Sequence, residues 1–272
     1  MKTQVAVWMA AVLMFGGAAQ AQKLKSQKEA DALMAIQNAP DPDARIAAIE
    51  SMLTKFADTD FKPMLLEAAA NEARGKGDAV VATVYYERSL DANPKSITAL
   101  AALAKLISEG TREFDLDKEE KLTKSDGLAK KALELGPAAA KPNVNMPDAD
   151  WENQKKDTMA QAHEALAAAA MARKKYDVAI AAYKLSMETG ASSDPATMVR
   201  LGVVYNAAGK YDDAIAILDK AMASPDAVAQ IKQVAGNEKV KALMAKKKAA
   251  PAAAPPAATP APAAPPAAPV KQ

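Results

Sequence analysis

The only histidine of the chain stands in a pattern that resembles the start of a zinc-protease helix. His163 and Glu164 begin this pattern, but Ala167 occupies the place of the second histidine that would complete the metal-binding face. Because the chain has one histidine, that site cannot be built, and we expect His163 to be a packing residue between helices. The chain also has no cysteine, which excludes disulfides, thiolate metal sites and cysteine nucleophiles.

Two further stretches resemble ligand loops but lack a residue that such loops require. Residues 115–119 begin like a calcium loop, yet Glu120 replaces the glycine of the sharp turn. The Gly-Lys-Gly of residues 75–77 lacks the third glycine of a dinucleotide loop and follows a helical pattern rather than a strand. We therefore expect a solvated acidic loop and a repeat turn, and we predict no enzyme, no cofactor and no metal site.

One carboxylate pair leaves a catalytic alternative open. Glycoside cleavage needs two carboxyl groups and neither metal nor histidine, so Asp148 and Asp150 could be proposed for it. Such pairs are usually solvated carboxylates at a helix start. The alternative is an enzyme or a solute-binding protein that uses the loop region of residues 138–150.

The stretch of residues 194–225 has the spacing of two short helices packed as a hairpin. Asp194 is a capping residue and Pro195 occupies the first helical position, where its missing N–H costs nothing. Gly209 supplies the left-handed conformation of a tight turn, and Pro225 ends the second helix. Neither helix can bury its apolar stripe alone, so the hairpin requires neighbours.

This hairpin resembles a tetratricopeptide repeat (TPR), a family of helical hairpins of 34 residues. The matching positions are Met198, Leu201, Gly202, Tyr205, Ala214, Leu218, Ala221 and Pro225. The pattern recurs 35 residues upstream, where Tyr176 and Asp177 correspond to Tyr211 and Asp212. A further copy carries Ala82, Tyr86, Ser89 and Pro94. The resemblance covers most of residues 60–225 and implies an all-α, right-handed superhelical solenoid of about five TPR-like hairpins with a C-terminal capping helix.

Two insertions and a terminal helix depart from the regular array. The first insertion, residues 111–120, lengthens one turn. The second, residues 138–150, precedes a long helix that we expect from Trp151 to about Lys174. Such loops are either recognition elements or tolerated surface variation. We expect Trp151 to pack this helix start against the third repeat. After Pro225 we expect a capping helix that is interrupted at Gly236 and has a polar outer face.

Composition divides the chain into three parts. Residues 1–21 combine Lys2, an apolar run and small residues before a cleavage site between Ala21 and Gln22, which is typical of a secretory signal peptide. Residues 22–248 form the TPR-like repeat domain. Residues 249–272 are almost entirely alanine and proline, and we expect a disordered tail, which is a spacer, a ligand for a groove or a solvated extension.

These parts predict a location and a class of partner. A cleaved signal, no lipid-anchor cysteine and no integral membrane segment after signal removal predict a periplasmic or secreted protein. The net charge of +2 is too small for a nucleic-acid binder. The partner is therefore expected to be a protein or peptide; its identity and the oligomeric state do not follow from the residues.

The TPR resemblance also implies a binding face. In that family the concave face is lined by the A helices, the first helix of each hairpin, and a partner's extended segment or helix lies across it. Carried onto this chain, the lining consists of Glu67, Asn71, Ala101, Lys105, Glu164, Ala168, Met171, Val199, Val203 and Asn206. Glu67 stands where a carboxylate-binding lysine would precede Asn71, so we predict an apolar peptide stripe or a helix as ligand. The predicted function is a non-catalytic protein-interaction scaffold outside the cytoplasm; an envelope or outer-membrane assembly subunit is the alternative among binding proteins.

Overall fold

The structure is a computed structural model of the 272-residue chain, and it describes residues 24–142, 146–192 and 194–249. The predicted signal peptide, its cleavage site between Ala21 and Gln22, and the tail after Ala249 lie outside these residues. Within the described ranges the chain forms eleven α-helices and one short 3-10 turn, with no strand. The expected all-α fold class is confirmed.

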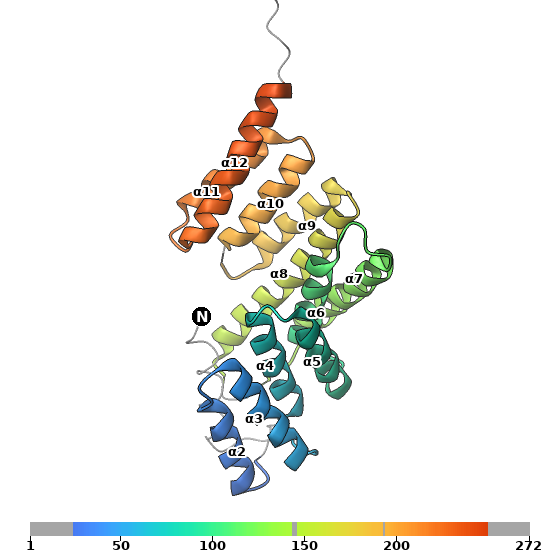
Figure 1. The fold of residues 1–272 in the computed structure, drawn as a ribbon, viewed down its shortest axis with the longest axis vertical. Helices are drawn as coiled ribbons and strands as arrows, with labels where there is room; N and C mark the ends of the chain where they lie inside the picture. The colour runs from blue at the N-terminus through green and yellow to red at the C-terminus, as the bar shows by residue number, and fades with distance from the viewer. Residues whose placement is uncertain (1–23, 143–145, 193, 250–272) are drawn as a thin grey trace, which may run out of the picture.

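The helices form five hairpins followed by one further helix (Figure 1). Their bounds are α2 Gln27–Gln37 and α3 Pro42–Lys55; α4 Lys62–Gly75 and α5 Ala79–Ala92; α6 Ile97–Gly110 and α7 Lys118–Leu135; α8 Asp148–Ala172 and α9 Tyr176–Thr189; α10 Pro195–Ala207 and α11 Tyr211–Ala223; and α12 Ala229–Ala249. The 3-10 turn η2 Gly136–Ala138 follows α7. None of the helices in the described ranges is long and apolar enough to cross a membrane.

The hairpins stack in chain order from α2 at the bottom of Figure 1 to α12 at the top. The second helix of each hairpin contacts the first helix of the next, as α3 contacts α4, α5 contacts α6, α9 contacts α10 and α11 contacts α12. Between the third and fourth hairpins the long helix α8 contacts both α6 and α7. The arrangement is the predicted solenoid, and α12 covers its end by contacting α10 and α11.

Proline and aspartate set two of the helix starts as the sequence predicts. The Asp41 carboxylate accepts a hydrogen bond from the N–H of Ala44 at 2.8 Å, with Pro42 at the first helical position of α3. Asp194 accepts from the N–H of Ala196 at 3.0 Å before α10. Each carboxylate satisfies an N–H group that has no partner within its helix.

Three of the hairpins turn within three residues, and each of these turns uses one left-handed residue. Gly77 and Gly209 have φ values of 82° and 72°, which glycine adopts without strain, whereas Lys174 adopts φ 60° at a cost of about 1 kcal/mol. The hairpin of α6 and α7 instead has the longer connection of residues 111–117. The first insertion is therefore a loop in the structure, although its last residues belong to α7.

The buried apolar side chains form three main cores along the array. The N-terminal core is made of large residues, and the middle core is rich in alanine. The core of α2 to α6 contains fully buried large residues, among them Phe61, Leu65 and Leu66. Between α6, α7 and α8 the core is mostly alanine: Ala101, Ala104, Ala129, Ala132, Ala162 and Ala165, with Leu100. Small side chains allow α8 to approach both preceding helices closely. A third core joins α8 to α12.

Three local expectations are corrected. Helix α7 begins at Lys118, inside the predicted insertion of residues 111–120, and α8 begins at Asp148, three residues before the predicted start at Trp151. Helix α12 continues through Gly236 without interruption. A glycine inside a helix costs about 1 kcal/mol relative to alanine, and packing of the buried Ala235 and Ala242 against the preceding hairpin outweighs that cost.

Candidate functional site

The ten residues predicted for the A-helix face occupy helices α4, α6, α8 and α10, but they differ in exposure. Ala101, Glu164 and Val199 are buried, so their side chains support helix packing and do not reach the surface. Asn71 is exposed. The six half-buried residues are Glu67, Lys105, Ala168, Met171, Val203 and Asn206. The part of the predicted face that a partner can touch is therefore reduced to these seven residues.

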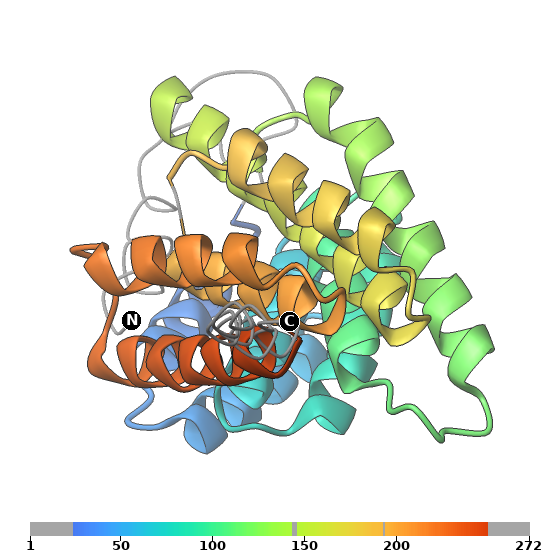
Figure 2. The same ribbon diagram turned by 90° about the horizontal axis from the view of Figure 1, so that it is seen from above.

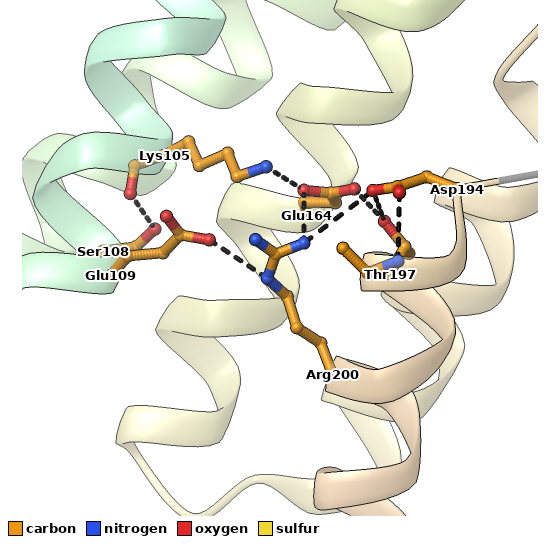
Figure 3. A network of polar contacts seen from close by, with 8 residues as sticks. Lys105, Ser108, Glu109, Glu164, Asp194, Thr197 and Arg200 are labelled. Carbon is orange, nitrogen blue, oxygen red and sulfur yellow. Dashed lines mark hydrogen bonds and ion pairs between the residues drawn. The ribbon is translucent and has the colours of Figure 1, made fainter. Parts of the chain in front are cut away.

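Glu164 connects three successive A helices (Figure 3). Its carboxylate forms an ion pair with Lys105 of α6 and accepts a hydrogen bond from the hydroxyl of Thr197 in the first turn of α10. The side chains of Glu164 and Lys105 are 8% and 18% exposed, so water screens this pair weakly. The contact joins residues 59 positions apart in the sequence and fixes α8 between α6 and α10.

Arg200 lies beside this pair at the edge of the same face. Its Nε is 3.3 Å from a carboxylate oxygen of Glu109, and its Nη1 is 3.7 Å from Glu164 and 3.9 Å from Asp194. Nη1 is buried and has no hydrogen bond in the described structure. Three carboxylates therefore offset the charge of Arg200, and the two nearest Nη1 lie too far away to fix the direction of its N–H groups.

Glu67 of α4 makes the same kind of connection without a cation. Its carboxylate accepts hydrogen bonds from the hydroxyls of Ser96 at 2.5 Å, Thr98 at 2.6 Å and Ser89 at 3.4 Å. Ser96 is the residue that caps α6. Burial raises the pKa of the Glu67 carboxyl from its ordinary 4.5, while the three hydroxyls act in the opposite direction.

The first hairpin repeats this contact between A helices. Glu29 of α2 is buried, and it accepts a hydrogen bond from the hydroxyl of Thr59, which lies just before α4. In all three cases a glutamate on one A helix meets a serine or threonine at the start of the next. The N-terminus of a helix attracts negative charge, so these carboxylates lie where the backbone favours them.

The two asparagines of the predicted face are held by neighbouring helices. Asn71 accepts a hydrogen bond at 2.7 Å from the hydroxyl of Tyr86, whose pKa burial raises to about 12. Asn206 donates from Nδ2 to the backbone oxygen of Glu238 in α12 at 3.1 Å. Their positions on the face are therefore set by packing between helices.

The residues with possible catalytic chemistry are not brought together. Burial lowers the pKa of His163. Asp148 pairs with Lys141, and Asp115 accepts from Lys121 and from the N–H of Arg112. The described residues include no group of three or more histidine, aspartate or glutamate side chains that could hold a metal ion.

The second insertion is anchored by Trp151. The indole packs with Met146 and with Ile97 at the start of α6, and its Nε1–H donates to the backbone oxygen of Ala139 at 3.2 Å. Trp151 thus joins the start of α8 to the third hairpin, as expected. Residues 143–145 of this insertion lie outside the described residues.

Comparison with solved structures identifies the fold. The crystal structure of a thermophilic TPR protein in Thermus thermophilus matches with a TM-score of 0.55 and 16% sequence identity, over 73% of this chain and 91% of that chain. The chain has a TPR-like fold. A TPR protein from Parabacteroides merdae has a TM-score of 0.41 and 16% identity, over 82% and 92% of the two chains.

The other two comparisons give no match to this TPR-like chain. No family model matches the sequence, and no curated protein matches it either. An identity of 16% to the Thermus thermophilus protein shows the fold alone.

Sequence reasoning missed the partners of the face's glutamates. The hydroxyl donors stand about one repeat length after the glutamates, at the start of the next A helix. Ser96 and Thr98 follow Glu67, and Thr197 follows Glu164. That recurrence of a hydroxyl one repeat after a glutamate was a usable signal. The position of Arg200 had no comparable signal, because the repeat spacing does not say which side chains meet across three helices.

Proposed function

We propose that this TPR-like chain is a non-catalytic protein-interaction scaffold that works outside the cytoplasm and binds a partner's peptide segment or helix along its A helices. One observation carries the proposal: contacts among Lys105, Glu164 and Arg200 join α6, α8 and α10 beneath the A-helix face and hold the three helices relative to one another (Figure 3). A face that is already fixed before binding costs little conformational entropy when a ligand docks.

The ligand would meet small and apolar side chains beside fixed polar ones. Ala168, Met171 and Val203 are half-buried, so each retains surface for contact. Asn71 on α4 and Arg200 on α10 supply polar groups to a backbone or carboxylate. This combination suits the apolar side of a helix or an extended peptide.

The test is affinity capture from an envelope extract with the chain of residues 22–272 as bait. The double variant Met171→Gln/Val203→Gln removes apolar contact on the A helices, and Val178→Gln on the exposed side of α9 is the matched control. We expect a reproducible partner with the unchanged chain and the control, and its loss with the double variant. Circular dichroism checks that all three proteins are folded.

A second bait ends at Lys248 and lacks the Ala/Pro tail. Retention of the partner by this bait assigns recognition to the helical array. Loss of the partner with the tail, or its retention by Met171→Gln/Val203→Gln, would contradict binding along the A helices.

A further inference from the structure

The outer side of the terminal helix α12 carries large apolar side chains. Val240, Leu243 and Met244 are 48%, 47% and 68% exposed, whereas Ala235 and Ala242 are buried against the preceding hairpin. The three exposed residues follow the helical spacing of three and four positions, so they form one stripe on the side opposite the buried alanines. The expected polar outer face of a capping helix is thus interrupted by an apolar stripe.

The same helix is strongly basic. It carries six lysines and one glutamate, a net charge of +5, although the whole chain carries only +2. Lys239, Lys241 and Lys246 each pair with a carboxylate, on Asp219, Glu238 and Asp212 respectively. The other three lysines, Lys232, Lys247 and Lys248, are exposed and have no carboxylate partner in the described ranges.

We infer that the outer side of α12 docks on the surface of an anionic lipid bilayer. Val240, Leu243 and Met244 enter the boundary between headgroups and acyl chains, while Lys247 and Lys248 contact lipid phosphates. Apolar contact together with attraction to anionic lipid is the combination that holds a helix at a membrane surface. The long lysine side chains keep their charges at headgroup level while the helix axis lies lower.

The position of α12 favours a lipid surface over an acidic protein. The helix is the last in the described ranges, and Figures 1 and 2 show it at one end of the described part of the molecule, beside α11. Its apolar side chains project outward from the helix, and a flat, deformable bilayer can surround them. Because α12 is already folded against α10 and α11, docking does not require the helix to form. This inference does not depend on the proposed binding along the A helices.

The test is flotation of the chain of residues 22–272 with vesicles of phosphatidylcholine alone or mixed with phosphatidylglycerol. This chain lacks the apolar run of residues 5–19, which could itself bind lipid. We expect flotation with the mixed vesicles only, and weaker binding at high salt. Leu243→Gln/Met244→Gln and Lys247→Gln/Lys248→Gln should each lower the partition coefficient by about tenfold or more.

Two matched double variants control for general loss of apolar or charged surface. Val178→Gln/Leu185→Gln changes two exposed apolar residues of α9, and Lys130→Gln/Lys131→Gln changes two exposed lysines of α7. Both should bind like the unchanged chain. A chain that ends at Ala249 should also bind, because the stripe and its lysines remain.

Three results would overturn the inference. One is no flotation of the unchanged chain with phosphatidylglycerol vesicles, which would leave an acidic protein as the occupant to test. Another is equal binding by the α12 variants and their controls. The third is loss of binding only with Lys247→Gln/Lys248→Gln, because charge attraction without the apolar stripe is not the proposed docking.

Discussion

Glu67 and Glu164 occupy corresponding places on A helices, and both bind hydroxyl groups at the start of the next A helix. Glu164 also has Lys105 beside it and Arg200 at 3.7 Å. Glu67 has three hydroxyl donors and no ion-pair partner among the described residues. The same residue at the same place therefore lies among cations in one repeat, and in another it is a carboxyl with a raised pKa that only hydroxyl groups contact.

The difference shows how neighbours decide the state of a carboxyl group in a repeat array. Burial disfavours the charged form, and hydroxyl hydrogen bonds recover only part of the lost hydration. A cation from another helix compensates for more of the carboxylate's lost hydration. The buried cation then depends on the carboxylate for its own charge balance. Four experiments test this comparison.

Glu164→Gln should have the largest effect. The amide has nearly the same shape but no charge, so the ammonium group of Lys105 would remain largely buried beside a neutral group. We expect a loss of about 3 kcal/mol in the free energy of unfolding, measured by urea denaturation with circular dichroism. A change below about 0.5 kcal/mol would show that the ion pair contributes little.

Replacing both members of the pair should recover much of that loss. In Lys105→Met/Glu164→Leu both charges of the buried pair are removed, and apolar side chains of similar length occupy the space, while Arg200 keeps Glu109 and Asp194. We expect at least about 1.5 kcal/mol of recovery relative to Glu164→Gln, because a buried pair is often no better than an apolar replacement. A double variant as unstable as Glu164→Gln would mean that the contacts of Glu164 with Thr197 and Arg200 dominate.

Glu67→Gln should change the pH dependence of stability. The folded-state pKa of Glu67 is raised above 4.5, so its stabilising contribution is complete below that value and is lost as pH rises through the raised pKa. Relative to Glu67→Gln, the unchanged protein should therefore lose stability as the pH rises from about 4.5 towards neutral. Urea midpoints of both proteins across this range measure the difference, which isolates Glu67 from other titrating groups. A constant difference would contradict the raised pKa.

The smallest expected effect compares the two threonines. Thr98→Val removes one of three hydroxyl donors from Glu67, and we expect a loss of about 1.5 kcal/mol. Thr197→Val leaves Glu164 with Lys105 and Arg200, so about 0.5 kcal/mol is expected. Urea denaturation of both variants gives the order. The reverse order would show that the hydroxyl matters more where cations are already present.

Much of the fold could be predicted because its signals are local. Asp194 with Pro195 and the left-handed Gly209 mark the ends of α10 within a few residues, and the repeat spacing identifies the hairpins. The same reasoning failed at Gly236, where helix propensity indicated an interruption but packing of α12 on α10 and α11 maintained the helix. Propensity is worth about 1 kcal/mol, and a packed helix side exceeds it.

The candidate site was predicted less completely. The repeat pattern placed Asn71, Met171 and Val203 on A helices where surface remains, but it also included Ala101 and Val199, which neighbouring helices bury. Burial depends on the side chains of adjacent hairpins and on the close approach of α8 to both α6 and α7. A single repeat's pattern carries no information on that approach.

The sequence alone determined that this chain is a series of helical hairpins, because helix caps, turn residues and apolar periodicity act within one hairpin. Only the tertiary structure decided which charged and hydroxyl groups meet. Lys105 reaches Glu164 across 59 residues, while Glu67 meets Ser96 and Thr98 and no cation in the described ranges. The reason is physical: local propensities fix each helix, whereas contacts between distant residues depend on how the side chains of neighbouring hairpins fill the space between them.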